Sequence, residues 1–256
     1  MVKPASSYII ASVQRSGTHL LCSILRSTGV AGSPDEFFLS KAGEAWESRW
    51  GAPSRHGYIE RVLRDNTGAN GVFGVVVMWS YFERMLQMLQ ELPEHNSFSG
   101  ADILGELLNR PKYIWLRRRN RVEQAVSWDM ACQTGVWAQR VGFNSQPETT
   151  LKFDFKAVDE WCNRIAEHEA SWANYFRESS IEPLVLYYED VVASHRRAAE
   201  RVLEFLGLAV PHGIEILAPA VEKQANEISD QWAASYRKLK RKQTSKLRNI
   251  ALRFRI

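Results

Sequence analysis

Residues 7–19 read SYIIASVQRSGTH, and this stretch decides the fold. Its first part, Ser7–Ser12, is short, carries two isoleucines and is apolar on both faces, as a strand buried in a parallel sheet is. A polar turn follows directly. From Gly17 onward apolar residues recur at helical spacing as far as Gly29, a residue type that helix C-termini favour. The stretch therefore predicts a strand, a tight loop and a helix in immediate succession.

The same strand-to-helix pattern recurs along the chain. Further strands are predicted at Val72–Trp79, Tyr113–Leu116 and Leu184–Tyr188. Helical patterns follow at Phe82–Leu89, from Val122 to Met130, and up to Gly207 with Asp190 as the N-cap, while Asp154–Ser179 reads as one long amphipathic helix. Alternating strands and helices predict an α/β fold of the P-loop-like kind, three layers (α/β/α) with a mostly parallel central sheet. Ligands bind such folds at the carboxyl ends of the strands.

Length and composition favour one large domain. The 256 residues are 45% hydrophobic and 24% charged, which supports a sizeable core and excludes disordered and coiled-coil classes. We expect a single domain over residues 1–236 and a basic tail over residues 237–256. The irregular segments 32–71 and 141–150 are predicted to be substrate loops.

Positive charge is concentrated at the C-terminus. Residues 237–256 contain nine basic side chains and no acidic one, whereas all 29 acidic and the other 24 basic side chains precede them. Such a tail suits contact with an anionic membrane surface, a glycolipid or nucleic acid, and the alternative is a solvated tail that aids solubility.

Targeting signals and cysteines point to a cytoplasmic protein. No run reaches the roughly 18 to 20 apolar residues of a membrane span, and the start lacks the apolar core of a secretory signal. Three widely spaced cysteines, Cys22, Cys132 and Cys162, suit reduced thiols better than disulfides. We expect a cytoplasmic location, with peripheral contact to the inner face of the membrane as one option.

The loop after the first strand has the composition of an anion-binding site. Arg15, Ser16, Gly17 and Thr18 supply a guanidinium, two hydroxyls and a glycine beside the amides of a helix N-terminus. The longer spacing and the lysine of a Walker loop are missing, which disfavours ordinary ATP chemistry. A purely structural Ser/Gly turn is the alternative interpretation.

A second cationic cluster follows the third predicted strand. Arg117, Arg118 and Arg119 come directly after it, and Asn120 and Ser127 are seven residues apart, hence on one helical face. Two anion sites at neighbouring strand ends suit a nucleotide phosphorylated at both ends of its ribose. The alternative is a solvated basic turn.

Several motifs together resemble bacterial trehalose 2-sulfotransferase and its relatives over nearly the whole chain. They are QRSGT at 14–18, AGSPDEFF at 31–38, QAVSW at 124–128 and QAN at 224–226 followed by Trp232. The resemblance implies sulfuryl transfer from 3'-phosphoadenosine 5'-phosphosulfate to a hydroxyl of a carbohydrate or glycolipid. It also implies a homodimer, without nucleic acid as a partner.

The resemblance assigns roles to individual residues. It places the 5'-phosphosulfate on Arg15, Ser16, Gly17 and Thr18, and the 3'-phosphate on Ser127 with either Arg118 or Arg119. It implies that Glu36 is the general base, that Arg15 stabilises the leaving phosphate, and that Gln224 lies in a loop that folds over the nucleotide. Two positions depart from the relatives. Val76 stands where they usually carry lysine. His19 stands where many have a hydroxyl, and it is a candidate donor ligand or alternative base, or simply a residue that caps the helix or packs.

Other readings stay open at this stage. The histidines show no spacing with cysteine or carboxylate that suggests zinc, so no metal is expected. Three aromatic residues in the predicted loops suit either sugar stacking or ordinary packing: Trp46, Trp50 and Tyr58. Trp128 and Trp137 suit contacts with adenine or with the core. A P-loop-like nucleotide kinase or phosphotransferase, and a non-catalytic protein that binds anions or nucleic acid, are the alternative functions.

Overall fold

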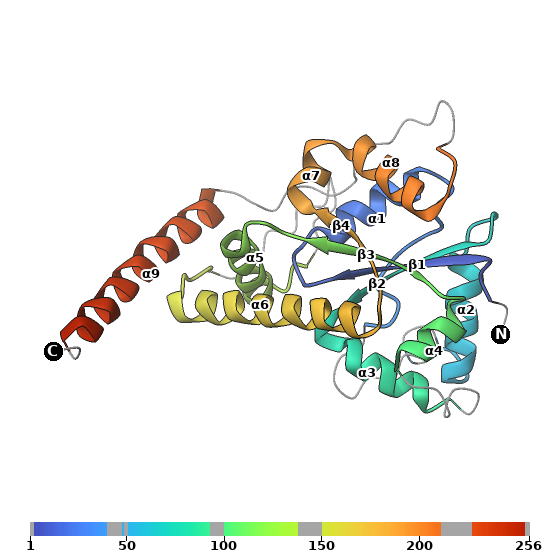
Figure 1. The fold of residues 1–256 in the computed structure, drawn as a ribbon, viewed down its shortest axis with the longest axis horizontal. Helices are drawn as coiled ribbons and strands as arrows, with labels where there is room; N and C mark the ends of the chain where they lie inside the picture. The colour runs from blue at the N-terminus through green and yellow to red at the C-terminus, as the bar shows by residue number, and fades with distance from the viewer. Residues whose placement is uncertain are drawn as a thin grey trace. The chain divides into compact units, whose positions relative to one another are not determined.

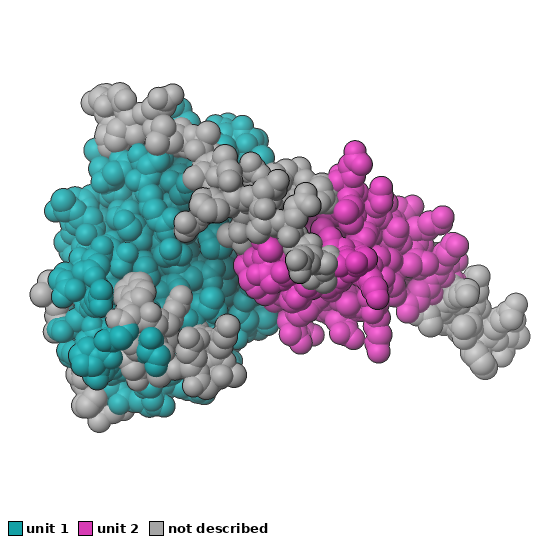
Figure 2. Space-filling view, turned by 180° about the vertical axis from the view of Figure 1, so that it is seen from behind, with its two compact units in different colours: residues 1–119, 168–220 teal, residues 120–167, 221–256 magenta. Residues whose placement is uncertain are grey.

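The structure is a computed structural model that describes residues 3–39, 48, 51–92, 100–137, 150–210 and 227–253. The chain forms two compact units (Figure 2). Unit 1 comprises residues 1–119 and 168–220, and unit 2 comprises residues 120–167 and 221–256. The proposed division at residue 236 stays a prediction.

A four-stranded parallel sheet forms the centre of unit 1. Its strands are β1 (Ser6–Ser12), β2 (Val72–Met78), β3 (Lys112–Arg117) and β4 (Leu184–Tyr187), in the order β2-β1-β3-β4. Every pairing is parallel, with Ser12 beside both Met78 and Leu116. All of β2 is buried, as its run of valines predicts. The four predicted strands are therefore confirmed.

Helices cover both faces of this sheet. Those of unit 1 are α1 (Thr18–Ser27), α2 (Arg55–Asn66), α3 (Trp79–Gln90), α4 (Gly100–Leu107), α7 (Tyr188–Ala193) and α8 (His195–Leu206). Figure 1 shows α1, α7 and α8 on one side and α3 and α4 on the other. The two faces are used because the chain steps from β1 to β2 and then back across β1 to β3, and right-handed crossovers in opposite directions leave their helices on opposite faces. The predicted three-layer α/β fold is confirmed.

The strand order determines where a ligand site can form. After β1 the chain turns toward β2 at one edge of the sheet, and after β3 it turns toward β4 at the other edge. The loops that follow the neighbouring strands β1 and β3 therefore run in opposite directions. In open α/β sheets the crevice at such a switch point, at the carboxyl ends of the strands, is where ligands bind. A ligand site is therefore expected at the loops that follow Ser12 and Arg117.

A tryptophan cluster supports this end of the sheet. The long helix α6 (Phe155–Glu178) confirms the predicted amphipathic helix, and its last part belongs to unit 1. Trp172 is fully buried and donates a hydrogen bond of 2.8 Å from Nε1 to the Ser12 carbonyl oxygen. Its ring packs against Phe82 and Phe176. The last residue of β1 is thus tied to the core.

The described part of unit 2 is mainly helical. Beside the first part of α6 it contains α5 (Arg121–Thr134) and α9 (Glu227–Arg253). Trp128 stacks on Trp161 at 4.8 Å, and the Asp129 carboxylate accepts hydrogen bonds from Trp161 and Gln133. Residues 237–253 of the predicted tail are helical and continue α9.

Two sequence predictions are wrong in detail. Asp190 does not cap the helix that ends before Gly207: Ser194 does, accepting a 3.2 Å hydrogen bond from the Arg197 amide. The segment 32–71 is not wholly irregular, because it contains α2, whose N-cap is Ser54. The predicted loop at 141–149, Trp46, Trp50 and Gln224 lie outside the described residues.

Candidate anion-binding site

The loop after β1 is a tight left-handed turn. Arg15 has φ +67° and Gly17 has φ +88°, and the Ser16 hydroxyl donates a 2.8 Å hydrogen bond to the Val13 carbonyl oxygen. The first helical bond of α1 runs from the Leu21 amide to the Gly17 carbonyl oxygen, and no side chain caps the helix. The amides of residues 18–20 therefore precede any intrahelical bond, which is the arrangement that binds anions.

Tyr188 packs directly on this turn. It is the first residue of α7 and follows β4 without a gap. A Cβ atom added to Gly17 would lie 2.4 Å from Cδ2 of the Tyr188 ring, so the glycine is required by contact as well as by its φ. The Arg118 guanidinium lies over the same ring, 4.7 Å from its centroid, and its Nη1 is 3.5 Å from the Arg15 carbonyl oxygen. The ends of β1, β3 and β4 therefore meet at one aromatic ring.

The three consecutive arginines have different surroundings. Arg117 makes a two-pronged ion pair with Glu169, at 3.0 and 3.2 Å, and its guanidinium lies 4.3 Å from the Trp115 ring. Arg119 makes a two-pronged pair with Asp190, at 2.7 and 2.8 Å. Hydrogen bonding to Arg119 is the main reason that the pKa of Asp190 is lowered. Arg118 is the member of the run that contacts the loop after β1.

Backbone contacts hold the turn that carries these arginines. The Arg119 amide donates to both carboxylate oxygens of Glu189, each at 3.1 Å. The Arg119 guanidinium also lies 4.1 Å from the Tyr187 ring. The consecutive residues 187–190 thus fix the end of β3. In the sequence, these four residues stand out only as an aromatic and acidic run at the end of another strand.

Glu36 lies on a loop that is anchored to both β2 and α1. Asp35 forms an isolated parallel bridge with Val75, and its carbonyl oxygen accepts a 2.9 Å bond from the Val76 amide. The Asp35 carboxylate pairs with Arg26 of α1 at 3.0 Å and accepts a 2.8 Å bond from the Glu36 amide. Val76, the departure noted in the sequence, is buried in the sheet.

The negative charge of Glu36 acts on a buried thiol of α1. The pKa of the Cys22 thiol is raised, chiefly by burial, and the negative charges of Asp35 and Glu36 add to this effect against the opposing charge of Arg26. The thiol of Cys22 stands one turn beyond Thr18 on α1. Glu36 is half-buried, so it combines access with a fixed backbone.

The remaining candidates are distributed as follows. His19 is exposed in the first turn of α1, and Thr18 is buried. Ser127 belongs to unit 2, half-buried in the second turn of α5. Asn120 is the N-cap of α5, where its Oδ1 accepts bonds from the Glu123 amide and, at 3.0 Å, from Arg237. It therefore acts as a helix cap.

Tyr58 and Trp128 are packing residues. Tyr58 is fully buried on α2 and donates a hydrogen bond to the Phe37 carbonyl oxygen, so of the two alternatives, sugar stacking and packing, the structure supports packing. Trp128 is buried against Trp161, whereas Trp137 is 45% exposed. Within the part of the chain that the structure describes, no three histidine, cysteine or carboxylate side chains gather as metal ligands do.

Fold and site together define a class: an α/β protein with a candidate anion-binding turn at the switch point of a parallel sheet. The Stf0 sulphotransferase family model matches residues 7–239, and the chain belongs to that family.

The chain is also similar to individual proteins. A trehalose 2-sulfotransferase of Mycobacterium tuberculosis is 28% identical over 267 residues, covering 93% of this chain and 96% of that protein. A trehalose 2-sulfotransferase of Mycolicibacterium smegmatis is 29% identical over 261 residues, covering 91% and 95%. Among solved structures, the sulfotransferase domain of the Synechococcus PCC 7002 olefin synthase aligns with TM-score 0.47 and 17% identity over 93% of this chain and 89% of that chain. No described helix is both long and apolar enough to cross a membrane.

Proposed function

We propose that the protein transfers a sulfuryl group from 3'-phosphoadenosine 5'-phosphosulfate to a hydroxyl of a carbohydrate or glycolipid. Family membership supports the sulfotransferase class. One observation supports the donor: the left-handed turn at Arg15–Gly17 and the Arg118 guanidinium meet at the switch point of the sheet. The names of the two mycobacterial relatives support a sugar acceptor.

The donor would bind with its two phosphate-bearing ends on different strand ends. Arg15, Ser16, Gly17, Thr18 and His19 would hold the 5'-phosphosulfate through amides, hydroxyls and the guanidinium. Ser127 with an arginine would hold the 3'-phosphate, and Gln224 would cover the nucleotide.

Of the two candidate arginines we favour Arg118. The Arg119 guanidinium already makes a two-pronged pair with Asp190, so recruiting it to a phosphate would mean breaking that pair. Arg118 instead lies on the Tyr188 ring beside the Arg15 turn. A guanidinium can bind a phosphate through two parallel N–H hydrogen bonds.

The chemistry would be an in-line displacement. The acceptor oxygen bonds to sulfur while the bond from sulfur to the bridging phosphate oxygen breaks, which yields a sulfate ester and 3'-phosphoadenosine 5'-phosphate. Negative charge grows on the bridging oxygen, and Arg15 would stabilise it. Glu36 would take the proton of the acceptor hydroxyl, since a carboxylate within hydrogen-bond reach makes an alcohol a competent nucleophile.

Calorimetric titration with 3'-phosphoadenosine 5'-phosphate, in the absence of metal, tests the donor site. We expect micromolar or tighter binding that weakens at least tenfold in Arg15→Ala, Ser127→Ala and Arg118→Gln. Arg119→Gln is the matched control for Arg118→Gln, because it removes the same charge one residue away, and it should bind nearly as the wild type does. Equal losses in the two glutamine variants would contradict the choice of Arg118. A preference for magnesium ATP would replace the proposal with a nucleotide kinase, and affinity for nucleic acid alone would indicate a binding protein.

The base is tested by turnover with a sugar panel that includes trehalose. Glu36→Gln should lower kcat at least a hundredfold while the affinity for the nucleotide stays within about threefold, because general base catalysis contributes about 10²–10⁴. Glu60→Gln, an exposed carboxylate change on α2, serves as the control. Near wild-type turnover in Glu36→Gln would remove Glu36 from the mechanism.

A further inference from the structure

The last 17 residues of α9 carry an uncompensated positive charge. Residues 237–253 contain eight basic side chains and no acidic one. Lys240 pairs with Asp159 at 2.6 Å, and Arg237 lies 3.8 Å from Glu123. In contrast, three exposed cations have no carboxylate partner among the residues whose side chains are described: Lys238, Arg241 and Lys242. This surface therefore attracts an external anion.

Apolar positions run along the opposite half of the same helix. Trp232 and Tyr236 are buried in unit 2, where they pack on Phe153 and Phe155. Leu239 follows three residues later, on the same face of the helix, and is 41% exposed. At 100° per residue, positions 232, 236, 239, 247 and 250 fall within an arc of about 80°. The cationic positions 238, 241, 242 and 248 fall on the opposite half of the helix, whereas positions 246 and 253 border the apolar arc. The apolar face that anchors α9 thus continues beyond its packed part.

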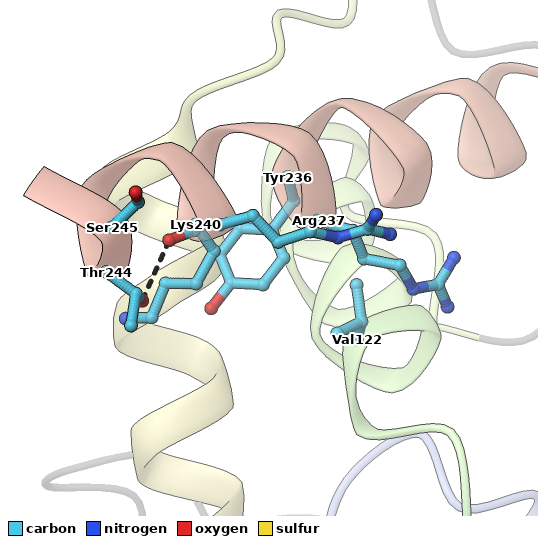
Figure 3. A pocket seen from close by; sticks show the side chains of 7 residues that line it. Val122, Tyr236, Arg237, Lys240, Thr244 and Ser245 are labelled. Atoms are coloured by element: carbon cyan, nitrogen blue, oxygen red, sulfur yellow. Dashed lines mark hydrogen bonds between the residues drawn. The ribbon is translucent and has the colours of Figure 1, made fainter.

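A hollow opens beside the cations. It has a volume of about 590 Å³ and lies between α9 and Val122 of α5, all within unit 2 (Figure 3). The α9 residues that line it include Arg237, Lys240, Arg241, Thr244 and Ser245. Ammonium, guanidinium and hydroxyl groups are the donors that bind a phosphate monoanion or diester.

We propose that α9 docks the protein on an anionic lipid bilayer, with its cations on the lipid phosphates and the stripe that begins at Leu239 in the boundary between headgroups and acyl chains. The hollow would receive one headgroup phosphate. A bilayer suits the surface better than a nucleic acid does, because an apolar stripe that is flanked and faced by cations on one helix matches a headgroup layer over hydrocarbon. The backbone of a nucleic acid would use the cations alone. This docking surface is independent of the proposed donor and acceptor.

Vesicle co-sedimentation of the full chain tests the docking. The vesicles contain either phosphatidylcholine alone or phosphatidylcholine with about 30% phosphatidylglycerol. We expect binding to the anionic vesicles that falls steeply with salt, and little binding to the neutral ones. The triple variant Lys238→Gln, Arg241→Gln, Lys242→Gln should bind anionic vesicles about 100-fold more weakly, at about fivefold per cation.

Two further variants make the test specific. The triple variant Arg61→Gln, Arg64→Gln, Arg196→Gln removes the same net charge from exposed helices of unit 1 and should keep most of the binding. Leu239→Gln should weaken binding to anionic vesicles without changing affinity for a short duplex DNA. Equal losses in the two triple variants would reduce the effect to net charge and overturn the proposal. Tighter binding to DNA than to vesicles, insensitive to Leu239→Gln, would overturn it in favour of a nucleic acid surface.

Discussion

Replacing Gly17 by alanine should damage the donor site through two separable costs. The first is conformational, because Gly17 has φ +88° and an L residue in the left-handed region costs about 1–2 kcal/mol. The second is steric, because the new Cβ would lie 2.4 Å from the Tyr188 ring, and overpacking of this kind costs about 1–3 kcal/mol. We therefore expect the free energy of unfolding to fall by about 2–5 kcal/mol. Binding of 3'-phosphoadenosine 5'-phosphate should be lost, since the turn must shift.

Gly29 provides the matched control. It also has positive φ, +69°, but a Cβ there meets no atom within 4 Å. Gly29→Ala should cost only the conformational part, about 1–2 kcal/mol, and leave nucleotide binding intact. Urea unfolding followed by tryptophan fluorescence measures stability, and calorimetry measures binding.

A double-mutant cycle isolates the contact with Tyr188. In a Tyr188→Ala background the collision is absent, so Gly17→Ala should cost no more than Gly29→Ala does. If Gly17→Ala and Gly29→Ala have the same effect on stability and binding in the otherwise wild-type chain, the idea that Tyr188 packs on the turn is refuted.

Three more predictions concern individual side chains. Tyr188→Phe should keep the nucleotide affinity, whereas Tyr188→Ala should weaken it about 5- to 30-fold in calorimetry, since a cation over an aromatic ring is worth about 1–2 kcal/mol. Similar affinities in the two variants would contradict the contact between the ring and the guanidinium. Burial would raise the pKa of Asp159, but hydrogen bonds, chiefly from Lys240, outweigh this effect and lower the pKa. The stability contributed by the pair should therefore be present above pH about 4 and lost as the pH falls further. The urea midpoints of wild type and Asp159→Asn should converge at low pH, and a constant gap would argue against the pairing. A thiol reagent should modify exposed Cys132 in the folded protein and should reach Cys22 only on unfolding, because the Cys22 thiol is buried and its pKa is raised. Mass spectrometry of the labelled peptides measures both, and rapid labelling of Cys22 would contradict its burial.

Local sequence determined most of the fold and the position of the candidate site. The strand, turn and helix of residues 7–27 are readable from the sequence because a buried strand and an amphipathic helix have different apolar periods. The same reasoning predicted the other strands and α6. It also placed the basic turns at strand ends, since alternating strands and helices imply a parallel sheet whose carboxyl ends share one edge.

Pairings between distant residues were decided only by the tertiary structure. Arg118 and Arg119 are equivalent in the sequence, yet Arg119 pairs with Asp190, 71 residues away, and Arg118 lies on Tyr188. Sequence reasoning took Asp190 for a helix cap because a local hydrogen bond is the simplest use of an aspartate before a helix. Tyr58 was expected in a loop because its local sequence is irregular, yet it is buried on α2. The partner of a side chain depends on which segments the fold brings beside it, and periodicity carries no information about contacts between residues far apart in the chain.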